Sequence, residues 1–393
     1  TTFVNAATNV TGALPVANGG TGLTSGFKNG VDPRPDAKPL IFNGNMEVAQ
    51  RATSKTGLTN GSSGYHTVDR WKWHENGSPS SVWTMTQETL TSGNAYANGF
   101  NNALKIDCTT AQGSLGAGDT LHIEQRFEKQ DLGAFKKGTA NAQKFTLAFW
   151  VKATKTGTNI VELQDQGNDR AVSASYTVSS SDTWEHKVVN FPADTSGNFG
   201  TGESLGLILR FYIYAGSNYT SSLQTTWGSS TTSARANGQV NNADSTSNNW
   251  HLTGVQMEVG EFSSTTLPPF QHESFGENYH RCCRYFFRRG EISRLGYGCV
   301  SGHASNLAYG AQVYYPTIMR ATPTQSHTDT SGFYFTGGGQ NQTLVSSGTI
   351  ANEGISKFGV TVGGQASGSL GIGNAYWFNT ENSSAYIQWD AEL

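Results

Sequence analysis

The stretch Phe145-Thr-Leu-Ala-Phe-Trp-Val-Lys152 decides the fold class of this chain. Phe145, Leu147, Phe149 and Val151 occupy every second position, and a β-strand turns such residues toward one face. Trp150 falls on the opposite face, so we expect it to point outward from the sheet or into a subunit interface. The stretch therefore predicts a strand with one buried face.

The same two-residue period returns along the rest of the chain. It recurs in 205–214, 254–260, 311–315, 358–362 and 385–389, with clusters of Gly, Asn, Asp and Ser between the runs. Such clusters mark turns. Residues 215–249 are mostly small and polar, which is typical of a long surface loop or of an excursion with short strands. Short strands alternating with turns predict an all-β protein built from a β-sandwich or jelly roll.

Composition supports an ordered β protein. Of 393 residues 47 are Gly, 14% are charged and 11% are aromatic. Disordered chains have a higher net charge and fewer aromatics. The net charge is −3 and no basic stripe occurs, so nucleic-acid binding is not expected. No run of about 18 apolar residues is present, so we expect no membrane insertion.

The chain divides into four predicted parts. Residues 1–39 form an extended Gly/Pro-rich connector that includes Leu14-Pro-Val-Ala-Asn-Gly-Gly-Thr-Gly22. Residues 40–272 form the jelly-roll domain. A helix beginning near Glu273 and a short strand make up 273–289, because apolar residues there recur at helical spacing before the strand. Residues 290–393 form a smaller C-terminal β-sandwich.

Several blocks of sequence resemble one protein family. They include Phe42-Asn-Gly-Asn-Met-Glu-Val-Ala-Gln-Arg51, Val68-Asp-Arg-Trp71, Trp250-His-Leu-Thr-Gly-Val-Gln-Met-Glu-Val-Gly260 and Ser274-Phe-Gly-Glu-Asn-Tyr-His-Arg-Cys-Cys-Arg-Tyr285. Together with the strip 14–22, they are similar to the tail fibres of marine and cyanobacterial phages, whose jelly-roll region is like a carbohydrate-binding module. The likeness covers about 40–287, and 316–323 resembles the start of the β tip that often follows.

The resemblance implies a homotrimeric virion fibre, assembled in the host cytoplasm. Its N-terminal side would attach to phage tail or adaptor proteins, and it would adsorb non-covalently to a host envelope glycan or outer-membrane receptor. Two alternatives remain open: a glycan-degrading tail spike enzyme and a purely structural capsid or tail adaptor fibre. The chain begins at Thr1 rather than Met, so a longer natural chain is also open.

The expected receptor-binding residues lie near the C-terminus, in two polar stretches that we expect to be loops. They are Gln340, Asn341, Tyr376, Trp377 and Asn379, because an aromatic flanked by amides can stack on a sugar while the amides bond its hydroxyls. The alternative is that Trp377 packs in the small core or across a trimer axis. A second choice is Trp71, Trp73 and Trp83, although residues two apart share a face that is commonly the core.

Catalytic and metal motifs are absent from the sequence. No GxSxG elbow, HExxH helix or P-loop occurs, and no CxxC spacing suggests zinc. We therefore expect no enzyme activity, no cofactor and no metal centre. A structural calcium ion near the first strand, with Glu47 contributing, is a lesser alternative. Cys108, Cys282, Cys283 and Cys299 are expected to be reduced and largely buried.

Overall fold

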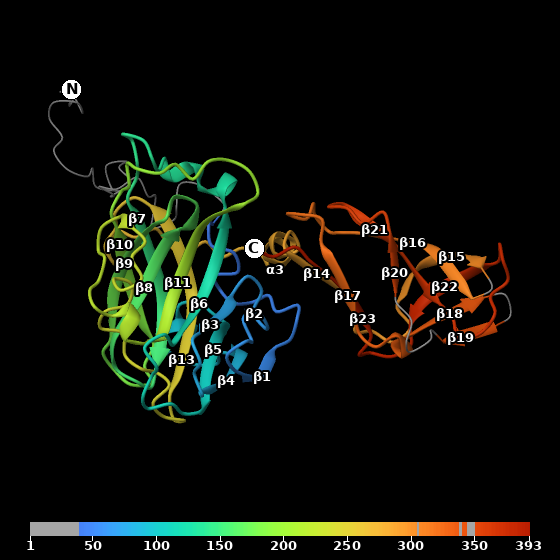
Figure 1. Ribbon diagram of the computed structural model, residues 1–393, viewed down its shortest axis with the longest axis horizontal. Helices are drawn as coiled ribbons and strands as arrows, with labels where there is room; N and C mark the ends of the chain where they lie inside the picture. The colour runs from blue at the N-terminus through green and yellow to red at the C-terminus, as the bar shows by residue number, and fades with distance from the viewer. Residues whose placement is uncertain (1–38, 305, 338–339, 344–349) are drawn as a thin grey trace, which may run out of the picture.

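Strand pairing organises the protein into two β domains in this computed structural model, which describes residues 39–304, 306–337, 340–343 and 350–393. Figure 1 shows the larger N-terminal domain and the C-terminal domain at opposite ends of the long axis, with helix α3 between them. Every strand pair in the described residues is antiparallel. The predicted connector, residues 1–39, lies outside the described residues except for Pro39.

The N-terminal domain is a β-sandwich of two sheets. The first sheet has the strand order β1 (Ser54–Leu58), β4 (Val82–Thr89), β5 (Asn102–Thr110), β13 (Asn249–Val259), β7 (Phe145–Ala153) and β10 (Glu185–Phe191). The second has the order β12 (Gly228–Ser229), β9 (Arg170–Val178), β8 (Gly157–Asp165), β11 (Leu205–Ala215), β6 (Thr120–Glu128), β3 (Lys72–Asn76) and β2 (Gly64–Tyr65).

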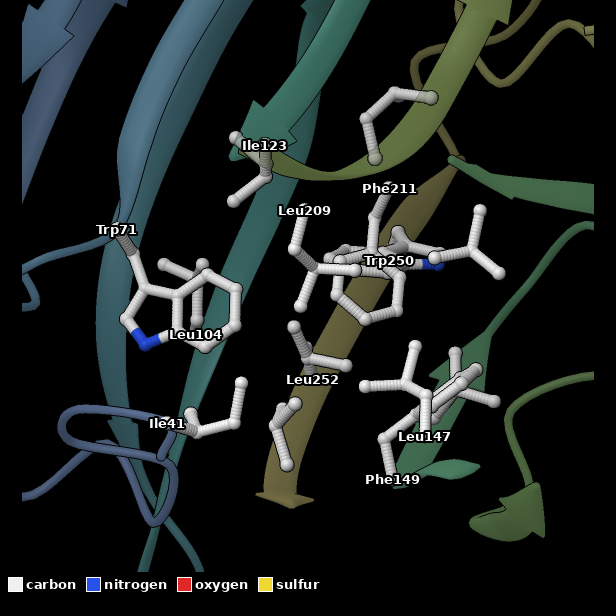
Figure 2. Close-up of a cluster of buried hydrophobic side chains, with 14 of the residues drawn as sticks. Ile41, Trp71, Leu104, Ile123, Leu147, Phe149, Leu209, Phe211, Trp250 and Leu252 are labelled. Carbon is white, nitrogen blue, oxygen red and sulfur yellow. The ribbon is translucent and has the colours of Figure 1, made fainter. Parts of the chain in front are cut away.

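The inward residues of these strands form the main core. Leu147 and Phe149 from β7 face Leu209 and Phe211 from β11, and Figure 2 shows them in one cluster with Trp250. Phe149 and Phe211 meet edge to face at 5.0 Å between ring centroids. The alternating apolar residues predicted the buried face, because both sheets turn their apolar sides toward each other.

The C-terminal domain packs a small sheet against a larger one. The third sheet has the order β14 (Phe286–Gly290), β23 (Tyr386–Asp390) and β17 (Thr324–His327). The fourth has the order β19 (Gln340–Thr343), β18 (Phe333–Gly337), β22 (Ala375–Thr380), β15 (Gly296–Ala304), β16 (Leu307–Tyr314), β21 (Gly359–Gln365) and β20 (Ala351–Glu353). Trp389 of the third sheet and Phe378 of the fourth belong to the shared core.

Helices are few and short, which confirms a mostly β protein built from sandwiches. Within the described residues they are α2 (Gly93–Ala97), α3 (Phe275–Cys282) and the 3₁₀ turns η2 (Lys129–Phe135), η3 (Gln166–Asn168), η4 (Ser217–Tyr219) and η5 (Thr330–Gly332). Helix α3 begins at a capping box, in which Ser274 and Glu277 satisfy each other's backbone N–H groups. No helix in the described part of the chain is long and apolar enough to cross a membrane.

The stretch 215–249, predicted to be a long surface loop or an excursion with short strands, connects β11 to β13 and covers part of the second sheet. Tyr219 and Leu223 from this segment pack on Ile160 and Tyr212, and Ala236 is buried with them. The segment also contributes the short edge strand β12. Thus the outer face of β8 and β11 is shielded from solvent although it lies outside the sandwich core.

Candidate functional site

Trp377 stands on the outer face of the fourth sheet. Its strand neighbours Tyr376 and Phe378 point into the C-terminal core, so the alternation along β22 turns the Trp377 indole outward. The side chain is 58% exposed. Its direct register partners are Cys299 on β15 and Thr336 on β18. An indole this exposed is available to a ligand.

A second aromatic ring lies on the same side of this sheet. Val313 on β16 points into the core, so Gln312 and Tyr314 point outward, and Tyr314 is 76% exposed. The order β22-β15-β16 places Tyr314 two strands from Trp377, a lateral separation of about 10 Å from ordinary strand spacing. Both rings are therefore exposed on the same side of one sheet.

Uncharged polar groups surround the two rings. Gln312 Nε2 donates to Thr361 Oγ1 at 2.7 Å, and Asn379 Nδ2 donates to Thr336 Oγ1 at 3.1 Å. We call the surface formed by Cys299, Gln312, Tyr314, Thr336, Thr361 and Trp377 the β22 face. It combines aromatic area with amide and hydroxyl groups, which suits a neutral amphipathic ligand.

The structure corrects the surroundings expected for the other C-terminal candidates. Tyr376 and Asn379 lie on strand β22 rather than in a turn, and both are buried. The Tyr376 hydroxyl accepts the backbone N–H of Gly371 at 2.8 Å. Gln340 and Asn341 belong to strand β19 and pair with Gly337 and Thr336, so they are not loop residues; their side chains lie outside the described part.

The second-choice tryptophans are corrected as well. Trp71, Trp73 and Trp83 are fully buried in the sandwich core. Trp73 packs on Trp83, and Figure 2 shows Trp71 among core side chains such as Leu104. No ring face is left for a sugar, because both sheets close over these residues. These three tryptophans are therefore core residues, the alternative that the two-residue spacing of Trp71 and Trp73 had suggested.

A buried ion network occupies the outer face of the second sheet. Arg210 on β11 reaches Glu124 Oε2 on β6 at 3.2 Å and Glu162 Oε2 on β8 at 3.0 Å. Burial opposes ionisation of Glu124, but contact with His122 and the charges of Arg210 and Arg126 outweigh it, so its pKa lies well below the usual value. Glu124 and Glu162 therefore each form an ion pair with an arginine. Their spacing in the sequence did not predict this network.

The same network contains one cluster of metal-ligand type. His74, His122 and Glu124 bring their ligand atoms within 4.8 Å of one another. However, Glu124 Oε1 accepts a hydrogen bond from Arg126 Nε, and Glu124 Oε2 accepts one from Arg210 Nε. A cation would therefore face two guanidinium groups, and the cluster does not fit a metal. Glu47, the calcium candidate, is in no such cluster within the described residues.

The sequence blocks that carried the family resemblance meet at the junction of the two domains. Asn278 Nδ2 of α3 donates to Asn43 Oδ1 at 3.2 Å and to Asn45 Oδ1 at 3.0 Å. Arg284 donates to both oxygens of the buried Glu128, each at 2.7 Å. These blocks therefore join the domains, a role that their residue types alone did not disclose.

Comparison with known proteins adds a distant structural likeness. No family model matches the chain, and no curated protein matches it. The enzymatically active domain of tailspike protein 4 of bacteriophage CBA120 is 13% identical with a TM-score of 0.28, and covers 52% of this chain and 21% of its own. The chain thus spans about a fifth of that tailspike chain.

Other solved structures with partial likeness are carbohydrate-binding modules. TmCBM61, solved with β-1,4-galactotriose, is 8% identical with a TM-score of 0.27, covering 57% of this chain and 99% of its own. The tandem CBM22-1-CBM22-2 of Xyn10C from Paenibacillus barcinonensis is 10% identical with a TM-score of 0.27. The match covers 90% of this chain and 96% of the tandem domain. The likeness is distant in every case.

Proposed function

We propose that the protein binds an envelope glycan non-covalently through the β22 face, as the receptor-binding part of a phage tail fibre. The observation that carries the binding proposal is the exposure of Trp377 and Tyr314 on one side of one sheet. Trp and Tyr each offer a flat apolar ring and a polar edge. A pyranose ring likewise has an apolar C–H side and hydroxyls at its edge, so the two surfaces match.

The lack of cationic side chains on the β22 face selects the kind of glycan, and the charged residue opposite Thr361, Glu353, is an anion. None of its six side chains is Asp, Glu, Lys or Arg. A strongly anionic polysaccharide would find no cation to pair with, so we assign a neutral glycan segment. The strands fix the ring positions before binding, which lowers the entropic cost of recognition.

Two features support the assignment to a tail fibre: the sequence blocks that resemble the family and the position of the β22 face in the C-terminal domain. If the N-terminal side attaches to the particle, as the resemblance implies, the C-terminal domain with the β22 face would be distal to it. In a homotrimer three copies of this face would act together, and weak single contacts would gain through avidity.

The test is binding of purified full-length protein to an array of bacterial envelope polysaccharides. Trp377→Ala should weaken binding about tenfold or more, because truncation of an aromatic hot spot typically costs about 2 kcal/mol. Tyr314→Ala should weaken it less. Phe275→Ala is the matched control, since Phe275 is similarly exposed but lies on α3.

Two outcomes would contradict the proposal. One is a Trp377→Ala protein that stays folded and binds every polysaccharide as the wild type does. The other is binding restricted to anionic polysaccharides, which would contradict the neutral class. A melting temperature measured for each variant separates lost binding from lost folding.

A further inference from the structure

A separate groove lies on the outer face of the first sheet, in the other domain from the β22 face. Trp150 on β7 and His186 on β10 are register partners, and their rings lie 5.1 Å apart at 36°. Trp150 is half-buried and points outward, as its position in the strand predicted. The segment 264–272 forms the opposite wall. The groove has a volume of about 430 Å³, within the usual range for ligand sites.

The floor of the groove is built by a glycine in a bulged strand. The register of β13 shifts between Thr253 and Gln256, and Gly254 there has φ +59°. A Cβ at Gly254 would lie 2.7 Å from Phe100 Cζ and 2.9 Å from Trp150 Cδ1. Glycine therefore lets both rings close over the backbone, and any side chain would force them apart.

The far wall is fixed by side-chain contacts. Phe270 meets Phe100 edge to face at 4.9 Å between centroids, and His272 packs on both rings. Gln256 Nε2 donates to the carbonyl of Pro268 at 2.9 Å, which ties this wall to the sheet. The groove is thus formed before any ligand arrives.

The lining indicates an uncharged ligand. Its residues include no Asp, Glu, Lys or Arg. Burial lowers the pKa of His186 and of His272, so both imidazoles are neutral at pH 7 and can each donate and accept one hydrogen bond. Asn98 and Ser264 add polar groups at the exposed rim. The lining itself offers no counter-charge to an anion or a cation, and the nearby Glu47 acts only on His272, whose pKa burial still lowers.

We infer that this groove is a second binding site, for a neutral hexose residue whose ring stacks on Trp150. Its hydroxyls would bond the neutral imidazoles of His186 and His272. The site does not depend on the β22 face, since the two lie in different domains and share no residue.

The test isolates the groove by using full-length Trp377→Ala protein as the parent. The probes are glucose, galactose, mannose and N-acetylglucosamine, with their β-1,4-linked oligosaccharides, observed by saturation-transfer NMR. We expect at least one probe to bind. Ser264→Tyr should fill the groove and abolish this binding without removing a core contact, while Thr265→Tyr adds the same group outside the lining and should leave it unchanged.

Each outcome of this experiment either supports the site or overturns it. Loss of binding in Ser264→Tyr, together with at least a tenfold loss in Trp150→Ala, supports the site. Equal binding by Ser264→Tyr and its parent would overturn it. So would the absence of binding by every neutral probe, or binding of a proline-rich peptide alone. If wild-type protein loses glycan binding with Ser264→Tyr but not with Trp377→Ala, the groove stands and the β22 face fails.

Discussion

Arg70 and Glu392 form a buried ion pair although 322 positions separate them in the chain. Arg70 belongs to the loop before β3, and Glu392 is the penultimate residue of the sequence. The Arg70 guanidinium also lies over the Tyr285 ring at 3.4 Å. The last residues of the chain therefore return from the C-terminal domain to the sandwich, where Figure 1 places the end of the chain between the two domains.

Replacement of Glu392 should destabilise the whole protein. In Glu392→Gln the fully buried Arg70 loses its partner, and an uncompensated buried charge costs about 3–5 kcal/mol. Urea unfolding would measure the loss in the free energy of unfolding. Glu381→Gln is the control, because Glu381 is exposed. A loss no larger than that of the control would show that the pair contributes nothing.

Removal of Arg210 should be similarly costly, and the cost should be recoverable. Arg210→Met leaves Glu124 and Glu162 buried without their shared cation, which predicts a loss of about 3–5 kcal/mol. The triple variant with Glu124→Gln and Glu162→Gln should regain part of it, since both buried negative charges are then gone, while Arg126 and Arg235, whose side chains are 17% and 19% exposed, lose a carboxylate partner. A triple variant as unstable as Arg210→Met would refute the charge explanation. Both are measured by urea unfolding.

Glu75 predicts a pH dependence of stability in the neutral range. Burial raises its pKa from 4.5 to about 7, against the hydrogen bond from Tyr214. The folded protein therefore holds this proton between pH 4.5 and 7 while the unfolded chain releases it, so the contribution to stability falls as pH rises through this window.

Glu75→Gln should remove this fall and raise stability above pH 7 by about 1 kcal/mol, a value reduced for solvent screening. The amide oxygen of Gln can still accept the Tyr214 hydroxyl. Melting temperatures of both proteins across pH 4 to 8 give the comparison. Parallel curves would contradict the assignment.

Cys299 should react with thiol reagents while the other three cysteines do not. It is exposed, whereas Cys108, Cys282 and Cys283 are buried, which corrects the expectation that all four are buried. Burial raises the pKa of Cys108 to about 11 and that of Cys283 to about 12, so their reactive thiolates are suppressed. Mass spectrometry after maleimide treatment of native protein would identify the modified residue.

The same modification should block the β22 face. Cys299 is the register partner of Trp377, so a bulky maleimide there would cover the indole. Labelled protein should lose polysaccharide binding, whereas maleimide treatment of Cys299→Ser should leave the binding of that variant unchanged. Unchanged binding after complete labelling would count against the β22 face as the site.

Association into a homotrimer stays a prediction. Apart from the two rings of the β22 face, the C-terminal domain exposes four large apolar residues in its described part: Ile292, Ile318, Phe358 and Ile372. Exposed apolar residues of this kind favour contact with another copy. Light scattering at micromolar concentration should give three times 42.1 kDa. A stable monomer at that concentration would exclude the trimer.

Absence of hydrolysis also stays a prediction. Glu124 and Glu162 are fully buried on the outer face of the second sheet, where Arg210 pairs with both of them. We expect no reducing ends to be released from the polysaccharide that the protein binds. Release that stops in Glu124→Gln or Glu162→Gln, with binding retained, would favour the tail spike alternative.

The sequence by itself determined where several strands lie and which of their residues share a face. The alternation in 145–152 correctly turned Phe149 inward and Trp150 outward, because successive side chains of a strand point to opposite sides. The capping residues Ser274 and Glu277 mark the start of α3 for an equally local reason. Such features depend on neighbours a few positions away, so they can be read directly.

Only the tertiary structure decided which side of a strand is covered and which residues meet. The sequence suggested a loop for Tyr376 and Trp377, but both lie on strand β22, where packing on one side of the fourth sheet makes Tyr376 a core residue and leaves Trp377 exposed. The ion pair of Arg70 with Glu392 likewise has no local signal. Contacts between distant segments arise from how whole sheets pack. The sequence around a charged or aromatic residue therefore does not show which distant residue it will contact.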